Sequence, residues 1–216
     1  MNADSVRVRD LGLCEYLPIY HQMREFSLAR QADDWDEFWL LEHNPVYTLG
    51  LNGKQAHILN AGNVPVVSVD RGGQVTYHGP GQLIAYVLLD MRRKSLGVRA
   101  VVSAMENALV ALLADMNINA AAKPEAPGVY VADKKIAALG LRIKNGKSYH
   151  GLSLNVDMDL SPFDGINPCG YENLEVVQIK QLKSTYSKQD IKQNLVTHLM
   201  RYLQYSRYEI MNEHDQ

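Results

Sequence analysis

The residues of this sequence best suited to covalent chemistry are a cysteine and a lysine. Cys169 lies in Asn167-Pro168-Cys169-Gly170, whose composition predicts a turn that presents the thiol at a rim. A thiol with an ordinary pKa of about 8.5 is only about 3% thiolate at neutral pH. A lysine ammonium about 4 Å away can supply the roughly 2 kcal/mol needed to bring such a pKa to about 7. Cys169 and Lys135 therefore form a candidate nucleophilic pair if the fold joins them; an inert loop cysteine is the equally weighted alternative.

A predicted β-hairpin orients Lys135. Asn145-Gly146 separates two β-rich runs and is the strongest short-range signal for a two-residue type I′ turn. Because side chains alternate across a strand, the resulting register turns Lys135 inward and Lys134 outward. An inward lysine needs a partner, unless its ammonium reaches water from the strand end. The expected pairs are Leu141 with His150, Leu139 with Leu152, Ala137 with Leu154 and Lys135 with Val156.

The same register predicts an apolar face and a wetter face of the hairpin. His150 falls on the apolar face, where a hydrogen-bonded core histidine is more common than a functional one. Cys14 lies among leucines before a helix and is expected to be a small core residue. The wetter face is expected to carry Lys134, Arg142, Lys144, Tyr149, Asn155 and Asp157.

Two glycine-containing segments partly resemble ligand-binding motifs. His78-Gly79-Pro80-Gly81 follows Gly72-Gly73 and could bring backbone amides close to a ligand, but it lacks GxGxxG spacing, and a tight turn is the alternative. Gly146-Lys147-Ser148 imitates a phosphate loop, but position 141 is a leucine instead of the required glycine. The histidines and cysteines lack metal-ligand spacing, so no metal site is expected.

The elements that must position these residues alternate irregularly between helix and strand. Helices are predicted for Tyr16 to about Arg30, around Val101 to Met116, and after a Ser187 N-cap. Strands are predicted for the segments 38–49, 65–69 and 82–91, the last covered on both faces because it is almost continuously apolar. This order predicts an α+β fold with a mixed β-sheet flanked by helices.

Composition indicates one globular domain over residues 1–216. Hydrophobic residues make up 46% of the 216 residues and charged residues 21%, which is enough for a sizeable core. The formal charge of −2 argues against nucleic acid as a partner. Two cysteines are too few for a disulfide framework and suit a reducing compartment. No signal peptide or membrane span is recognised, so a cytoplasmic location is expected.

Four ordered motifs resemble one enzyme family. They are RGGQVTYHGPGQL (71–83), PGVYV with KIAALGLRI (127–131 and 135–143), HGLSLNV (150–156) and NPCGY (167–171). Over about residues 30–210 the sequence resembles the lipoyl(octanoyl) transferases, whose fold is that of the biotin and lipoate protein ligases. Four motifs in order are far more specific than any single one.

The resemblance implies an acyltransferase without cofactor or metal. Octanoyl (or lipoyl) would move from acyl carrier protein to a thioester on Cys169, and then to a lysine of the lipoyl domains of 2-oxoacid dehydrogenases or of the glycine cleavage H protein. Lys135 would promote the thiolate and act as acid and base. The implied substrate-binding residues are Arg71, Gly72, Gly73, Gln74, Val75, Thr76, Tyr77, His78, Ala138, Leu139, Gly140, Gly151, Leu152 and Ser153.

Two alternatives remain beside this interpretation. An ATP-dependent lipoate or biotin ligase on the same fold needs a lysine but no cysteine nucleophile, so the cysteine of NPCG argues against it. A non-catalytic module that binds acyl groups or carrier proteins would leave Cys169 incidental. Basic residues that could meet an acidic carrier protein are Arg92, Arg93, Lys94, Arg142, Lys144 and Lys147, although an ordinary solvated face explains them equally well.

Overall fold

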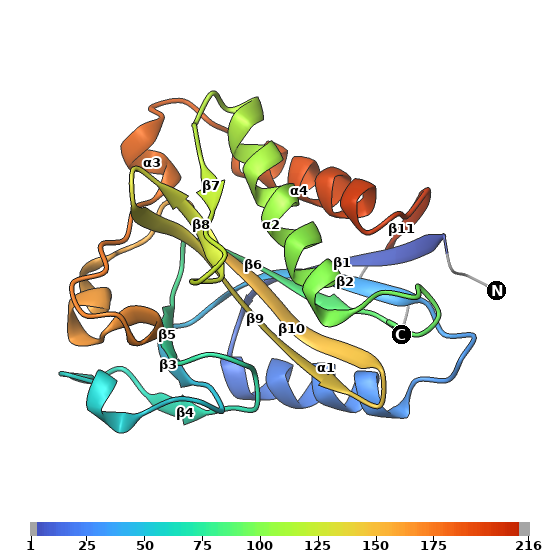
Figure 1. Ribbon diagram of the computed structural model, residues 1–216, viewed down its shortest axis with the longest axis horizontal. Helices are drawn as coiled ribbons and strands as arrows, with labels where there is room; N and C mark the ends of the chain where they lie inside the picture. Colours follow the sequence, from blue (N-terminus) through green and yellow to red (C-terminus); the bar gives the residue numbers. More distant parts are fainter. Residues whose placement is uncertain (1–3, 212–216) are drawn as a thin grey trace.

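The computed structural model describes residues 4–211, whose core is an eight-stranded mixed sheet (Figure 1). The sheet order is β11-β1-β2-β6-β10-β9-β8-β7, and a smaller sheet has the order β4-β3-β5. The pairs β1–β11 and β1–β2 are parallel and the other ladders of the large sheet are antiparallel, which confirms the predicted α+β class.

The elements succeed one another in this order: β1 (Ser5–Cys14), α1 (Tyr16–Ala29), β2 (Asp36–His43), β3 (Val46–Leu49), η1 (Gln55–His57), β4 (Val66–Ser68), β5 (Val75–His78), β6 (Gln82–Leu88), α2 (Val98–Asp115), β7 (Ala121–Ala122), β8 (Gly128–Val131), β9 (Lys134–Lys144), β10 (Lys147–Asn155), η2 (Ser161–Gly165), η3 (Pro168–Gly170), α3 (Ile179–Leu182), α4 (Lys188–Tyr202) and β11 (Arg207–Met211).

Helices cover both faces of the large sheet, with α2 and α4 on one face and α1 on the other (Figure 1). Strand β6 shows why its sequence is continuously apolar: Leu83, Ala85 and Val87 join the α2 and α4 core, and the residues between them join the α1 core. The predicted Ser187 cap of α4 is also confirmed, because its Oγ accepts a hydrogen bond from the Asp190 backbone amide at 3.1 Å.

One predicted strand is wrong. The segment 38–49 is not continuous: it belongs to β2 in the large sheet and β3 in the small sheet, with a bend at Asn44 and Pro45 between them. Proline lacks the amide hydrogen that a strand needs, which explains the break. The split matters for the site because β3 then pairs with β4 and β5, and Gly72 in the loop between those two strands donates its N–H to the Leu141 carbonyl of the hairpin at 2.9 Å.

The β9–β10 register agrees with the sequence prediction from Lys144–Lys147 to Ala137–Leu154. The expected pair of Lys135 with Val156 is wrong, because β10 ends at Asn155. The Lys135 backbone instead pairs with a later segment: its N–H donates to the Glu175 carbonyl at 2.8 Å, and Val177 N–H donates to its carbonyl at 3.0 Å. The backbone of Lys135 is thus held in a sheet from both sides.

The expected division of the hairpin into apolar and wet faces holds only in part. His150 has a φ of 64°, which breaks the alternation, and its ring stacks on Tyr149 with centroids 5.2 Å apart. Both side chains hydrogen-bond to Asp70, so His150 leaves the face on which simple alternation places it. Tyr149 and Asn155, expected on a wet face, are buried because α1 and the segment around Val177 cover them.

The buried carboxylate of Asp36, at the start of β2, bonds to several other segments of the chain. Asp36 Oδ1 lies 2.7 Å from Arg30 Nη2 and 2.7 Å from Arg93 Nη2, and it accepts the Asp90 backbone amide at 2.7 Å. The Tyr205 hydroxyl donates to Oδ2. The end of α1, the turn after β6 and the segment before β11 therefore converge on one side chain of β2.

We expect Asp36→Ala to lower the free energy of unfolding by about 3–5 kcal/mol, because it leaves two buried guanidinium groups without their counter-ion. The measurement is urea unfolding followed by circular dichroism. The matched control is Glu209→Gln, which removes an exposed pair with Arg7 and should cost less than about 1 kcal/mol. Equal losses in the two variants would contradict this role of Asp36.

Candidate active site

The structure brings Lys135 and Cys169 into contact although they lie 34 residues apart. Lys135 Nζ is 2.9 Å from Cys169 Sγ, and the lysine is 3% exposed. Its ammonium also donates to the Pro127 carbonyl at 3.3 Å and lies 5.2 Å from the centroid of the Tyr130 ring. Lys135 therefore points inward, as the hairpin predicts, and does not extend its ammonium to water.

Cys169 has an unusual backbone conformation in its turn. Cys169 has a φ of 57°, in the left-handed region that residues with a side chain seldom occupy. The turn is closed by a hydrogen bond from Gly170 N–H to the Asn167 carbonyl at 2.9 Å, and Asn167 N–H in turn donates to the His57 carbonyl at 2.8 Å. Such conformations persist where the surroundings impose them, and they gather at functional sites.

Electrostatics in the pair favour the charged lysine. Burial opposes the ammonium form of Lys135, but interactions with a Cys169 thiolate and with Tyr130 together outweigh burial. The pKa of Lys135 consequently lies above its ordinary value. An ammonium that is retained beside sulfur can stabilise a thiolate and can also deliver a proton.

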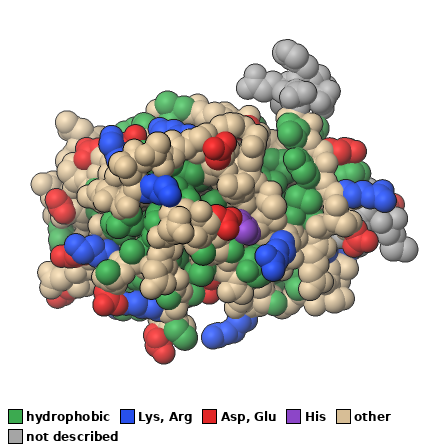
Figure 2. Space-filling view, turned by 90° about the horizontal axis from the view of Figure 1, so that it is seen from above, with side chains coloured by type: hydrophobic (Ala, Val, Ile, Leu, Met, Phe, Trp, Pro, Cys, Tyr) green, Lys and Arg blue, Asp and Glu red, His purple; other side chains and the backbone are tan. Residues whose placement is uncertain are grey.

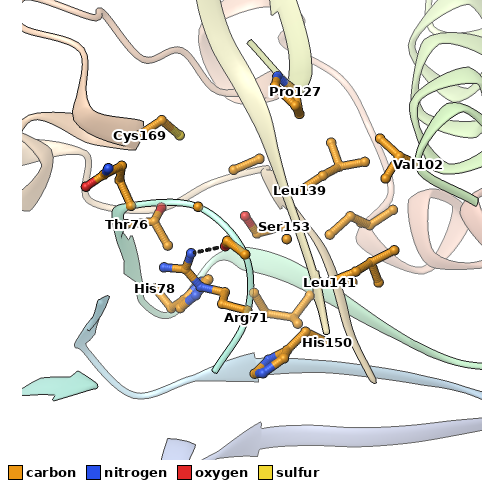
Figure 3. Close-up of a pocket in the computed structure, with 18 of the residues that line it drawn as sticks. Arg71, Thr76, His78, Val102, Pro127, Leu139, Leu141, His150, Ser153 and Cys169 are labelled. Atoms are coloured by element: carbon orange, nitrogen blue, oxygen red, sulfur yellow. Dashed lines mark hydrogen bonds between the residues drawn. The ribbon is translucent and has the colours of Figure 1, made fainter. Parts of the chain in front are cut away.

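The dyad opens into a cavity of about 340 Å³ (Figure 3). In Figure 3, Cys169 lies on one side of the cavity and Val102 on the other, with Leu139 between them. The predicted residues that line the cavity are Arg71, Gly72, Gly73, Gln74, Val75, Thr76, His78, Ala138, Leu139, Gly140, Gly151, Leu152 and Ser153. This is the size and largely apolar character expected of a small-ligand pocket.

Tyr77 is the exception among the predicted substrate-binding residues. Its neighbours Thr76 and His78 line the cavity, whereas Tyr77 packs on Tyr47 and Phe163, with ring centroids 5.5 Å and 5.6 Å away. Alternation along β5 causes this difference, because consecutive side chains of a strand point to opposite faces. Tyr77 therefore stabilises the small sheet and is not a pocket residue.

Several pocket residues were missed by sequence reasoning. Those from α1, β6 and α2 lie where an apolar pattern predicts only core packing, and the others come from the loop before β8, from β9, from β10 and from the residue after η3. Periodicity did not separate them from ordinary core residues, although Pro127, Leu141, Ile143, His150 and Tyr171 lie within the family motifs. These additional lining residues are Tyr16, Ile84, Tyr86, Val98, Val102, Ala126, Pro127, Leu141, Ile143, His150 and Tyr171.

The polar end of the pocket combines one buried cation with neutral histidines. Burial lowers the pKa of His78 to about 3, and its Nδ1 lies 2.6 Å from Gln82 Oε1. Burial also lowers the pKa of His150, despite a hydrogen bond to Asp70. Both rings are neutral at physiological pH, so neither supplies charge to a ligand. The charge comes from Arg71, whose guanidinium donates only to carbonyl and hydroxyl oxygens within the described residues.

Residues 4–211 contain neither a metal-binding cluster nor a membrane-spanning helix. No three His, Cys, Asp or Glu side chains gather closely enough there to hold a metal ion. No helix in that part of the chain has the length and apolar character needed to cross a membrane. Cys14, expected in the core, is half-buried at the end of β1, and its thiol donates to the Leu11 carbonyl at 3.1 Å.

The structure thus combines a mixed sheet with a cysteine beside a largely apolar pocket. The family model of the lipoyl protein ligase A/B catalytic domain matches residues 20–200. The chain is 53% identical to the octanoyltransferase of Stutzerimonas stutzeri, over 98% of this chain and 96% of that protein. It is 54% identical to that of Pseudomonas entomophila, over 92% and 93% of the two chains. The chain belongs to the lipoyl protein ligase A/B catalytic domain family.

Solved structures with low sequence identity share the fold. A bi-partite lipoate protein ligase from Thermoplasma acidophilum superposes with a TM-score of 0.73 at 14% identity, covering 97% of this chain and 88% of that one. A biotin protein ligase from Aquifex aeolicus has a TM-score of 0.54 at 9% identity, covering 94% and 69%. The predicted ligase-like architecture is therefore confirmed.

We expect Lys135→Ala to move the pH at which Cys169 becomes reactive upward by about 1–3 units, because an adjacent positive charge favours a thiolate by that amount. The measurement is the rate of Cys169 alkylation by iodoacetamide against pH, with the labelled peptide identified by mass spectrometry. Lys134→Ala, one residue away but exposed, is the control and should leave the profile unchanged. An unshifted profile in Lys135→Ala would rule out the electrostatic role.

Proposed function

We propose that this chain is an octanoyltransferase that carries the acyl group as a thioester on Cys169. The observation that carries the proposal is the 2.9 Å contact between Lys135 Nζ and Cys169 Sγ at the end of the apolar pocket. It is supported by relatives named octanoyltransferase that are 51–54% identical over nearly the whole chain. The donor is octanoyl-acyl carrier protein, and the acceptors are lysines of lipoyl domains and of the glycine cleavage H protein.

The first step transfers the acyl group to the enzyme. The Cys169 thiolate attacks the thioester carbonyl of the donor, and a new C–S bond forms as the carbonyl becomes an oxyanion. When this intermediate collapses, the bond to the carrier sulfur breaks, and the leaving thiolate takes a proton from the Lys135 ammonium. The products are acyl-Cys169, neutral Lys135 and the free thiol of the carrier.

The second step restores the pair. The acceptor lysine amine attacks the acyl-Cys169 carbonyl, the new C–N bond forms, and the C–S bond to Cys169 breaks. The proton lost by the amine passes to Lys135, which leaves an ammonium beside a thiolate as at the start. Thioester to amide is a downhill exchange, so the cycle needs no ATP, and the proposed steps use neither a metal nor another cofactor.

The acyl chain is proposed to lie in the pocket between β9, β10 and α2. Leu139, Leu152 and Val102 offer apolar surface there, and each buried methylene contributes about 0.8 kcal/mol. The neutral state of His78 and His150 suits an uncharged ligand. Cys169 and Lys135 are thus proposed as catalytic residues, and the predicted pocket residues other than Tyr77 as the substrate-binding set.

The candidate basic residues for docking acidic partners are not equally accessible. Arg93 is bound to Asp36, and Lys147 Nζ donates to the Arg30 carbonyl, so both have structural roles. Lys144, which is exposed on the β9–β10 hairpin, is proposed as a better candidate, together with Arg142, which is partly exposed with its Nε 3.9 Å from Asp70 Oδ2. On the face in Figure 2, lysine and arginine side chains are mixed with acidic ones, in keeping with the net charge of −2.

The chain is further proposed to act as one catalytic domain, with the ligase-like part at about residues 30–210 and the family model at 20–200. A reactive thiol at Cys169 must stay reduced between cycles. A cytoplasmic location is therefore part of the proposal.

We expect the chain to gain the mass of one octanoyl group when it is mixed with octanoyl-acyl carrier protein in the absence of ATP. Intact-mass spectrometry measures the adduct, and peptide mapping should place it on Cys169. Cys169→Ser should form no stable thioester, whereas Cys14→Ser, the matched cysteine control, should behave as wild type.

The same measurement separates the alternatives. Activity that requires ATP and leaves no adduct on Cys169 would support a ligase and would contradict the transferase. Carrier binding without an adduct or acyl transfer would support a binding module. Release of the adduct by a lipoyl domain, with octanoyl appearing on that domain's lysine, completes the transferase cycle.

A further inference from the structure

The carbonyl that accepts from Lys135 belongs to the loop before β8, and that loop is held from three sides. Residues 123–127 connect β7 to β8 and include Pro127, whose carbonyl lies 3.3 Å from Lys135 Nζ. The Tyr130 hydroxyl donates to the Ala126 carbonyl at 2.9 Å. The Tyr171 hydroxyl, two residues beyond Cys169, donates to the Glu125 carbonyl at 3.3 Å. These two tyrosine contacts come from the loop's own strand and from the cysteine turn.

The third contact comes from α2 and is made by a carboxylate. Gly128 N–H donates to Glu106 Oε1 at 3.1 Å, directly after Pro127 in the chain. Glu106 is half-buried, whereas the next residue of the helix, Asn107, is exposed. The hydrogen bond involves an ionisable acceptor, which makes it stronger than a bond between neutral groups.

Gly128 lies close enough to the dyad for this bond to matter. It has a φ of 145°, and a methyl group on its Cα would meet Lys135 Nζ at 3.2 Å and the Ala137 carbonyl at 2.8 Å. The peptide that joins Pro127 to Gly128 therefore contacts Lys135 on its carbonyl side and Glu106 on its amide side. Because a peptide unit is planar, fixing its N–H also fixes its C=O.

We propose that Glu106 is a positioning residue for the dyad: its carboxylate orients the Pro127–Gly128 peptide, whose carbonyl directs the Lys135 ammonium onto Cys169. This inference rests on the proposed function of the pair and adds a residue to it from helix α2. Glu106 acts through the peptide, since no ion pair among the described residues joins it to Lys135.

The other charged or titratable groups that face the pair are on different elements. Tyr130 on β8 lies beside Lys135, and Lys123 Nζ lies 4.6 Å from the centroid of the same ring. Arg71 interacts electrostatically with Cys169 from the loop before β5. No hydrogen bond or ion pair among the described residues joins Glu106 to any of these three side chains, so the structure links Glu106 to the pair through the Pro127–Gly128 peptide.

The test compares Glu106→Leu with Glu106→Gln, which keeps a side-chain oxygen that can accept from Gly128 N–H but removes the charge. We expect Glu106→Leu to shift the alkylation profile of Cys169 toward higher pH, in the direction of Lys135→Ala. It should also slow thioester formation about tenfold, because a displaced ammonium is out of line for proton transfer. Glu106→Gln should restore most of both properties.

Asn107→Leu is the matched control, since it makes a similar change on the exposed side of the same helix and should leave both properties unchanged. Thermal unfolding of each variant identifies a loss that is merely structural. An unshifted alkylation profile in folded Glu106→Leu would overturn the proposal, and so would a Glu106→Gln profile as altered as that of Glu106→Leu. Alkylation needs no acyl donor and therefore tests Glu106 even if octanoyl transfer fails. Intact-mass spectrometry tests octanoyl transfer independently.

Discussion

The structure depends on one buried charge, the ammonium of Lys135. An ammonium that is removed from water must find a partner, and the interior offers three: the sulfur of Cys169, the carbonyl of Pro127 and the face of Tyr130. The carbonyl and the ring lie at or in β8 and the sulfur lies in η3, so the ammonium of Lys135 on β9 is satisfied only after β8, β9 and η3 have come together. The same need for a partner that constrains the fold also places a proton donor against a thiol.

The pocket has a charged part and an uncharged part. Its charged groups are concentrated around Lys135, Cys169 and Arg71, whereas burial keeps His78 and His150 neutral. A ligand with one reactive carbonyl and an apolar tail matches such a distribution. The helices on the two faces have different roles. Helix α1 packs against the face that carries Trp39 and Tyr86, whereas α2 contributes Val102 to the cavity and Glu106 to the loop before β8.

The basic residues illustrate how structure assigns different tasks to similar side chains. Arg30 and Arg93 are used to neutralise Asp36, which joins α1, β2 and the turn after β6. Arg71 is held by Thr48 and by its own loop, with its charge left toward the pocket. Arg142 and Lys144 stay at the surface of the hairpin. The family motif singles out Arg71, but local sequence does not distinguish the roles of the others, because each depends on which carboxylate or carbonyl lies within reach.

The sequence by itself determined the features that depend on local periodicity and turn chemistry. Asn145-Gly146 set the hairpin register, alternation turned Lys135 inward, and the ordered motifs indicated the family. Tertiary structure decided the rest. The backbone partner of Lys135 is Glu175 and not Val156, His150 turns toward Asp70, and Tyr77 points away from the pocket. These outcomes depend on where a strand stops or bulges and on which distant segment fills the space, and local propensities do not encode such long-range contacts.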